Sequence, residues 1–142
     1  MTQLMTRRAV TVLLAAAIAS IAMMGVAVGH SGDQSYVYLD IFDESIEGGI
    51  HYPIEDLNDV LGVDIPDDPE GATAWAEANP QVIHSYGEAH LFMSDLDGSE
   101  WPIVFGGFDG IEGVDGAYLV SEFEVDRTFV TVPRQFSVTY DA

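Results

Sequence analysis

The apolar stretch near the N-terminus constrains the fold most, because it takes about a fifth of the 142 residues out of the folded domain. Two arginines precede Ala9–Val28, which holds almost no polar side chain. A basic start, an apolar stretch and small residues at positions −3 and −1 of the cut are typical of a secretory signal peptide. Ala27 and Gly29 predict cleavage before His30, so residues 1–29 are the predicted signal peptide. A cut after Ala27 and an uncleaved membrane anchor are the alternatives, since about 20 apolar residues span a bilayer.

Residues 30–142 have a length that suits one compact domain. The signal peptide places this domain outside the cytoplasm, in the periplasm, at the cell surface or secreted. The sequence contains no cysteine. An exported domain without disulfides relies on packing or on bound ions for its stability. The absence of cysteine also excludes thiolate metal sites and cysteine nucleophiles.

Acidic charge is the strongest compositional feature. All 24 Asp and Glu residues follow residue 29, lysine is absent and only Arg127 and Arg134 oppose them, which gives residues 30–142 a charge of −22. Such a surface repels nucleic acid and anionic lipid, so neither is predicted as a partner. The acidic residues are spread along the chain, which favours adaptation to a saline habitat where salt screens their repulsion. A surface that collects cations is the alternative interpretation.

The hydrophobic periodicity predicts an α+β fold. The expected strands cover residues 34–43, 46–52, 89–94, 101–105, 117–125 and 136–140, and the expected helices cover residues 53–61, 73–78 and 80 to 88 or 90. We therefore expect an antiparallel sheet or sandwich-like strands, with two or three short helices inserted after the first hairpin.

The helix ends carry local signals. Pro53 is expected to open the first helix and Gly62 to close it, because proline suits the first turn and glycine suits the left-handed cap. Asn79 is expected to cap the third helix, with Pro80 at its first position.

Glycine and aspartate mark the predicted turns between strands. The pair Gly48-Gly49 predicts a bulge in the second strand. Residues 95–98 predict a tight turn that joins two strands into a hairpin. Residues 106–116 are rich in glycine and aspartate and are predicted to be a loop.

Several short motifs follow one another in an order that resembles a known family. They are His30, Ser35-Tyr36, Asp56-Leu57, Leu61-Gly62-Val63-Asp64, Trp75-Ala76-Glu77, Tyr86 and Gly116-Ala117-Tyr118-Leu119. Together they resemble the extracytoplasmic N-terminal domain of HupE/UreJ-like membrane proteins, over nearly all of residues 30–142. In that family a multi-helix membrane region, related to nickel and cobalt permeases, follows the domain. The resemblance therefore implies a membrane-embedded partner, or a membrane region that this chain has lost.

The resemblance also implies an EF-hand-like calcium loop between Asp64 and Glu77. In such a loop, alternate carboxylates, one main-chain carbonyl and a final bidentate glutamate surround the ion. The spacing of Gly71 and Glu77 fits, whereas Pro66 occupies the first ligand position and Asp64 replaces it only if the loop bulges. The candidate ligands are Asp64, Asp68, Glu70, the carbonyl of Ala72, and Glu77. A solvated acidic loop that leads into a helix is the alternative.

His30 is a candidate ligand for copper or nickel. As a mature N-terminus it offers an amine and an imidazole to one ion, and imidazole suits both metals. His51, His84 or His90 would complete the site, but their spacing in the sequence does not bring them together. An exposed terminus and three ordinary histidines are the alternative.

No catalytic motif is present: the sequence lacks a G-x-S-x-G element, an H-E-x-x-H element and a phosphate-binding glycine loop. We therefore predict a non-enzymatic, exported accessory or sensor domain that binds a divalent cation. The alternative is a salt-adapted structural or protein-interaction domain with no specific ligand.

Overall fold

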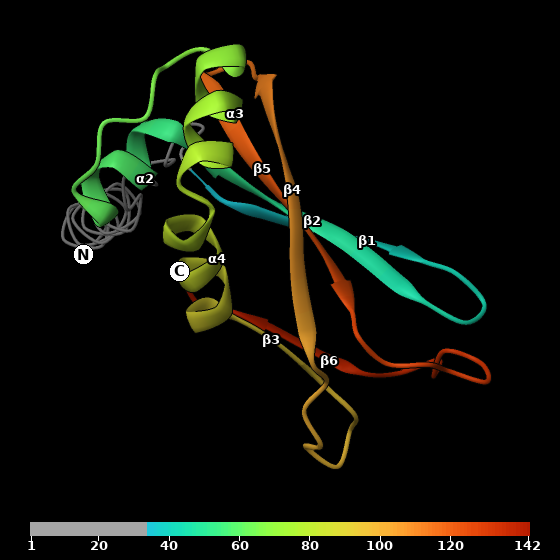
Figure 1. Ribbon diagram of the computed structural model, residues 1–142. Helices are drawn as coiled ribbons and strands as arrows, with labels where there is room; N and C mark the ends of the chain where they lie inside the picture. Colours follow the sequence, from blue (N-terminus) through green and yellow to red (C-terminus); the bar gives the residue numbers. More distant parts are fainter. Residues whose placement is uncertain (1–33) are drawn as a thin grey trace, which may run out of the picture. The chain divides into compact units, whose positions relative to one another are not determined.

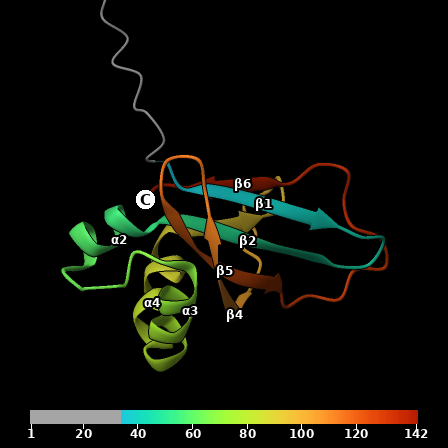
Figure 2. The same cartoon turned by 90° about the horizontal axis from the view of Figure 1, so that it is seen from above.

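The computed structural model describes residues 34–142, which form an α+β fold (Figure 1, Figure 2). Four antiparallel strands make the main sheet in the order β1-β2-β5-β4, and β3 pairs with β6 in a second sheet. The strands are β1 (Tyr36–Ile41), β2 (Ile46–Pro53), β3 (Leu91–Ser94), β4 (Ile103–Glu112), β5 (Ala117–Val125) and β6 (Ser137–Tyr140), and the helices are α2 (Ile54–Leu61), α3 (Pro69–Ala78) and α4 (Pro80–His90). The predicted fold class, with short helices after the first hairpin, is confirmed.

The ends of α2 and the start of α4 follow the local signals. α2 begins directly after Pro53 and ends at Gly62, whose φ of 65° lies in the left-handed region that glycine adopts freely. α4 begins at Pro80. Asn79 occupies the predicted N-cap position of α4, but its side chain makes no capping bond there, because its amide donates to the Trp75 carbonyl at 2.8 Å. Asn79 is the only residue between α3 and α4, and its side chain satisfies a main-chain carbonyl at the end of α3.

α3 begins at Pro69, earlier than the predicted start at Thr73. Asp68 has an extended backbone, and its Oδ1 accepts a hydrogen bond from the N–H of Gly71 at 2.8 Å. Pro69 then occupies the first helical position, where no N–H donor is needed. An aspartate cap followed by proline is a helix start that was readable in the sequence. Much of the predicted acidic loop is therefore helical.

The glycine pair in β2 produces no bulge, contrary to the prediction. Tyr38 lies opposite Gly49, and Leu39 lies opposite Gly48, in a continuous register. A Cβ atom added to Gly49 would meet atoms of the Tyr38 ring at 2.7–2.9 Å, so the ring lies directly over the glycine. Gly49 thus makes room for an aromatic side chain of the neighbouring strand, a pairing that compensates for the missing side chain.

The predicted hairpin around residues 95–98 forms only next to its turn. The Trp101 N–H donates to the Met93 carbonyl at 2.8 Å, and one isolated bridge joins Ser94 to Glu100. Beyond this point β3 pairs with β6, and β4 pairs with β5. The hairpin prediction is wrong for most of its length, because β5 offers β4 a longer partner than the four-residue β3 does.

Residues 106–116, predicted to be a loop, belong largely to β4. The strand continues to residue 112 before a turn leads into β5. Its register with β5 shifts between Phe105 and Phe108, and this bulge takes up Gly106 and Gly107. Pairing with β5 therefore overrides the low strand preference of glycine.

The core lies on the inner face of the main sheet. α3 and α4 lie together on this side, and both contact β4 and β5 (Figure 1, Figure 2). Alternate residues of β2 and β5 point inward and are buried; they include Ile46, Ile50, Tyr52, Leu119, Phe123 and Val125. The remaining residues point to the opposite side, which we call the open face. Its outward side chains include Tyr36, Tyr38, Asp40, Glu47, Glu122 and Glu124.

Candidate functional site

Three carboxylates lie side by side across the open face. Asp40 of β1 is the direct partner of Glu47 in β2, and Glu47 is the direct partner of Glu124 in β5. All three side chains are exposed. Directly opposed like charges destabilise a sheet, so this arrangement carries an energetic cost. We call these three residues the acidic row.

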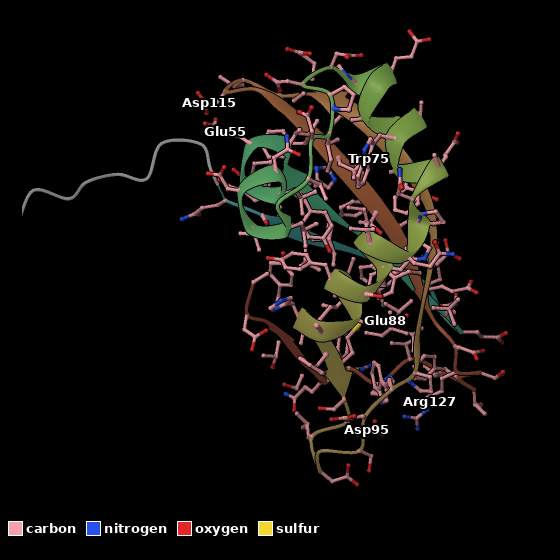
Figure 3. All side chains as sticks on the ribbon, turned by 60° about the vertical axis from the view of Figure 1, so that its left-hand side comes forward. Glu55, Trp75, Glu88, Asp95, Asp115 and Arg127 are labelled. Carbon is pink, nitrogen blue, oxygen red and sulfur yellow. The ribbon has the colours of Figure 1, made fainter. Side chains whose placement is uncertain are left out.

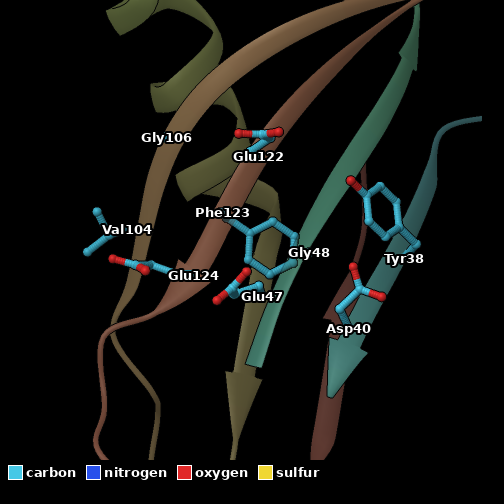
Figure 4. A pocket seen from close by; sticks show the side chains of 9 residues that line it. All are labelled: Tyr38, Asp40, Glu47, Gly48, Val104, Gly106, Glu122, Phe123 and Glu124. Carbon is cyan, nitrogen blue, oxygen red and sulfur yellow. The ribbon is translucent and has the colours of Figure 1, made fainter. Parts of the chain in front are cut away.

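A shallow cavity of about 280 Å³ adjoins the acidic row (Figure 4). The cavity is also lined by Tyr38 and Glu122. These two residues lie on either side of Gly49, in the row of the open face next to the acidic row. A Cβ atom on Gly107 would lie 3.2 Å from a carboxylate oxygen of Glu122, so the bulge of β4 leaves room for that side chain. The cavity thus joins four carboxylates and one phenol on a single surface.

The electrostatic environment of Tyr38 reports the negative charge of this surface. Partial burial raises the pKa of the Tyr38 hydroxyl, and the carboxylates of Glu122, Asp40 and Asp109 raise it further. The neutral phenol is favoured because its ionised form would add another negative charge. A positively charged ligand would relieve the same repulsion.

No ion pair among residues 34–142 neutralises the acidic row. Arg127 instead pairs with Asp95 at 2.8 Å, and His90 Nδ1 lies 3.2 Å from a carboxylate oxygen of Asp141. Arg127 lies beside Asp95 (Figure 3) and does not line the cavity, and its guanidinium also lies over the Trp101 ring. The cationic side chain of Arg127 is therefore engaged elsewhere.

Exposed aromatic and apolar side chains border the acidic row. Tyr36 and Tyr38 are 50% and 40% exposed, and Val104 is 45% exposed beside Glu124. Tyr38 also makes an edge-on contact with the His51 ring, with centroids 5.1 Å apart. Aromatic side chains are enriched at protein interfaces, and the rim of such interfaces is polar.

The predicted calcium ligands between Asp64 and Glu77 do not converge. Asp68 caps α3, and the other candidates from Glu70 to Glu77 lie along that helix. A helix extends its residues along an axis, with main-chain carbonyls directed to the next turn, whereas a calcium loop wraps around the ion. Residues 34–142 contain no group of three His, Asp or Glu side chains placed to hold a metal.

The histidines also lie in separate environments, and His30 falls outside the described residues. His51 lies on the open face, where burial lowers its pKa. His84 Nε2 donates to the Gly106 carbonyl at 3.0 Å, and His90 pairs with Asp141. The structure therefore brings no two of these three histidines together as ligands.

A second, larger cavity of about 600 Å³ lies beside α2 and the end of β2. Its lining includes Tyr52, Tyr86 and Tyr140. Burial raises the pKa of all three tyrosines, and most strongly that of Tyr52. The Tyr52 hydroxyl is buried without a hydrogen-bond partner among the described residues.

The acidic row was not predicted from the sequence, although the outward position of Asp40 was. The alternation of Tyr36, Tyr38 and Asp40 placed these side chains on one side of the first strand. The strand order β1-β2-β5, which aligns Glu47 with a residue 77 positions later in the chain, has no local signal.

The chain matches no protein-family model, no curated protein and no solved structure. The resemblance to HupE/UreJ-like proteins therefore stays a prediction. Within residues 34–142, no helix combines the length and apolar character needed to cross a membrane.

Proposed function

We propose that the chain is an exported, non-catalytic binding domain whose open face holds lysine or arginine side chains of a partner protein. The observation that supports this proposal best is the acidic row: Asp40, Glu47 and Glu124 stand directly opposite one another without a cation from the described residues. Natural sheets avoid such rows, because like charges in register weaken strand pairing. A membrane-embedded protein, which the family resemblance implies, is one source of the basic side chains.

The geometry favours several cationic side chains over one bare metal ion. Adjacent strands lie roughly 4.8 Å apart, so three side chains on three strands spread over about 10 Å. Calcium ligands surround one ion at about 2.3–2.6 Å. Separate ammonium or guanidinium groups, one for each carboxylate, fit the wider spacing, and the bordering tyrosines offer aromatic contacts for them.

Salt adaptation is the competing explanation for the acidic residues. It predicts that every exposed carboxylate contributes equally to cation attraction, through net charge alone. Our proposal predicts that the acidic row contributes more than carboxylates elsewhere. A charge-matched comparison separates the two explanations.

The test measures binding of a fluorescent ten-residue polylysine peptide by anisotropy, at low and at physiological salt. The double variant Glu47→Gln/Glu124→Gln should bind about tenfold more weakly than the control Glu55→Gln/Glu88→Gln. Glu55 and Glu88 lie on α2 and α4 and are exposed, so both variants lose the same charge (Figure 3). Equal losses in the two variants would support salt adaptation and refute the proposal.

Metal binding is tested separately, because calcium at residues 64–77 and copper or nickel at His30 stay predictions. The protein is stripped with a chelator and melted at fixed, high sodium chloride with and without each metal. A ligand at about 100 times its dissociation constant adds roughly 2.7 kcal/mol to the free energy of unfolding. A rise in Tm with calcium that Glu77→Gln abolishes would establish the calcium loop, and no rise would refute it.

A further inference from the structure

The two edges of the main sheet are protected very differently. The strand order β1-β2-β5-β4 makes β1 and β4 the two edges of the sheet. The β4 edge contacts α3: the Gly110 N–H donates to Thr73 Oγ1 at 2.8 Å, and a Cβ on Gly110 would overlap the Pro69 main chain. A bulge between Phe105 and Phe108 also distorts β4. Coverage and bulges are two ways in which sheets prevent unwanted strand addition.

The β1 edge has neither protection among the described residues. β1 pairs with β2 in a continuous register of six residues, without a bulge and without proline. No main-chain hydrogen bond from residues 36–41 goes to any element other than β2. The side chain of Tyr140, at the end of β6, contacts Ser35 just before β1, but β6 pairs only with β3. The outward N–H and C=O groups of β1 are therefore available to another strand.

Apolar side chains concentrate along this edge. Tyr36, Tyr38, Ile41 and Phe42 are all large, apolar and at least 40% exposed. Asp40 is the only charged side chain in β1. A strand that combines free main-chain groups with exposed aromatic side chains is suited to binding an extended peptide by strand addition.

We propose that β1 is the docking edge of the domain, and that an extended basic segment of the partner protein adds to it as a fifth strand. This inference rests on the proposed function, because the added strand places a basic side chain beside Asp40, at the end of the acidic row. Alternate residues of a strand face the same side of the sheet. Every second residue of the partner segment would therefore lie on the open face, one of them opposite Asp40 and the others beside Tyr38 and Tyr36. The residues between them would cover the half-buried Val37 and Leu39.

Charge decides between a basic partner and a second copy of this chain. Two copies paired through β1 would each bring Asp40 and a domain charge of −22 to the same interface. That repulsion opposes pairing of the domain with itself. A basic segment gains from the same charge, so it is the occupant that the surface favours.

The experiment uses the purified protein and a ten-residue peptide that alternates lysine and valine. Two further peptides carry N-methyl groups, one on every lysine amide and the other on every valine amide. In a strand, alternate residues direct their N–H groups to opposite edges. Only one methylated set would face β1, so only that peptide should bind about tenfold more weakly or worse, since it loses several hydrogen bonds. Amide hydrogen exchange of residues 36–41 should also slow on binding of the unmodified peptide.

The outcomes separate this inference from the proposed function. If both methylated peptides bind as well as the parent while Glu47→Gln/Glu124→Gln still weakens binding, strand addition is refuted and the basic docking surface stands. If both methylated peptides lose affinity equally, the loss arises in the peptide itself and strand addition is likewise refuted. If neither the parent peptide nor polylysine binds, both proposals fail.

Discussion

The two faces of the main sheet are made by the same four strands, yet they affect the stability of the folded state in opposite ways. On the inner face, Ile50 and Leu119 are completely buried beneath helices and loops. On the open face, each cross-strand neighbour in the acidic row carries the same charge as the next. Apolar burial on the inner face lowers the free energy of the folded state, whereas the open face raises it at the acidic row.

This difference indicates which residues the fold itself requires. Burial of apolar side chains drives folding, so the inner face is determined by stability. The open face contributes little burial at Glu47 and Glu124, and their repulsion must be offset by the core. An uncharged residue with a high strand propensity, such as threonine, would give a more stable folded state at these two positions. The acidic row therefore calls for an explanation outside folding, and the proposed binding of basic side chains supplies one.

The largest expected effect is on the inner face. Ile50→Ala should lower the free energy of unfolding by about 3 kcal/mol, because it removes buried contacts and leaves a cavity at a fully buried position. Urea denaturation measures the change. Glu122→Ala on the open face is the control and should change the same quantity by less than about 0.5 kcal/mol. Similar losses for the two variants would remove the distinction between the faces.

The next effect concerns the buried phenol of Tyr52, also on the inner face. Tyr52→Phe should raise the free energy of unfolding by about 1 kcal/mol, because the hydroxyl is buried without a hydrogen-bond partner among residues 34–142. Thermal and urea denaturation give the value. Tyr38→Phe, which alters an exposed phenol, is the matched control with little expected change. A loss of stability in Tyr52→Phe would mean that the hydroxyl is satisfied in solution.

A smaller gain is expected on the open face. Glu47→Gln should raise the free energy of unfolding by about 0.5 kcal/mol at low salt, since Glu47 opposes both Asp40 and Glu124. The gain should shrink in high salt, which screens exposed charges. Glu55→Gln is the charge-matched control, and it should instead lose about 0.3 kcal/mol, because Glu55 lies in the first turn of α2. Equal gains in both variants would point to net charge alone.

The smallest effect is a titration. Burial and nearby carboxylates raise the pKa of Tyr38 above its ordinary value of 10.0, so the folded state holds this proton more tightly than the unfolded chain does. The resulting stability is present below about pH 10 and is lost as the pH rises through the folded-state pKa. Glu122→Gln should move the pKa of Tyr38 back toward 10.0, as measured by NMR of the ring. Glu88→Gln, far from this cavity, should leave it unchanged.

Much of the fold was predictable because its signals are local. Pro53 and Gly62 delimit α2, and Pro80 starts α4, since proline and glycine act on their own main-chain angles. The alternation in β1 and β5 identified both strands and their two faces. The signal for the start of α3, Asp68 followed by Pro69, was also local. It was not recognised because the same acidic residues were interpreted as a calcium loop.

The errors in strand pairing have a different origin. β4 leaves its sequence neighbour β3 for β5, and the glycines that predicted a loop lie within that pairing. The energy of such pairing comes from contacts between segments that are distant in the chain, and no window of local sequence contains both partners.

The sequence by itself determined the ends of α2, the start of α4, the two-sided character of the strands and the large negative charge, because each depends on single residues or on their immediate spacing. Only the tertiary structure decided which outward-facing acids become neighbours. Asp40, Glu47 and Glu124 form one row only through the order β1-β2-β5, and the same order leaves β1 at an edge. Strand order arises from the burial of the inner face as a whole, so the site on the open face is a consequence of packing on the other side.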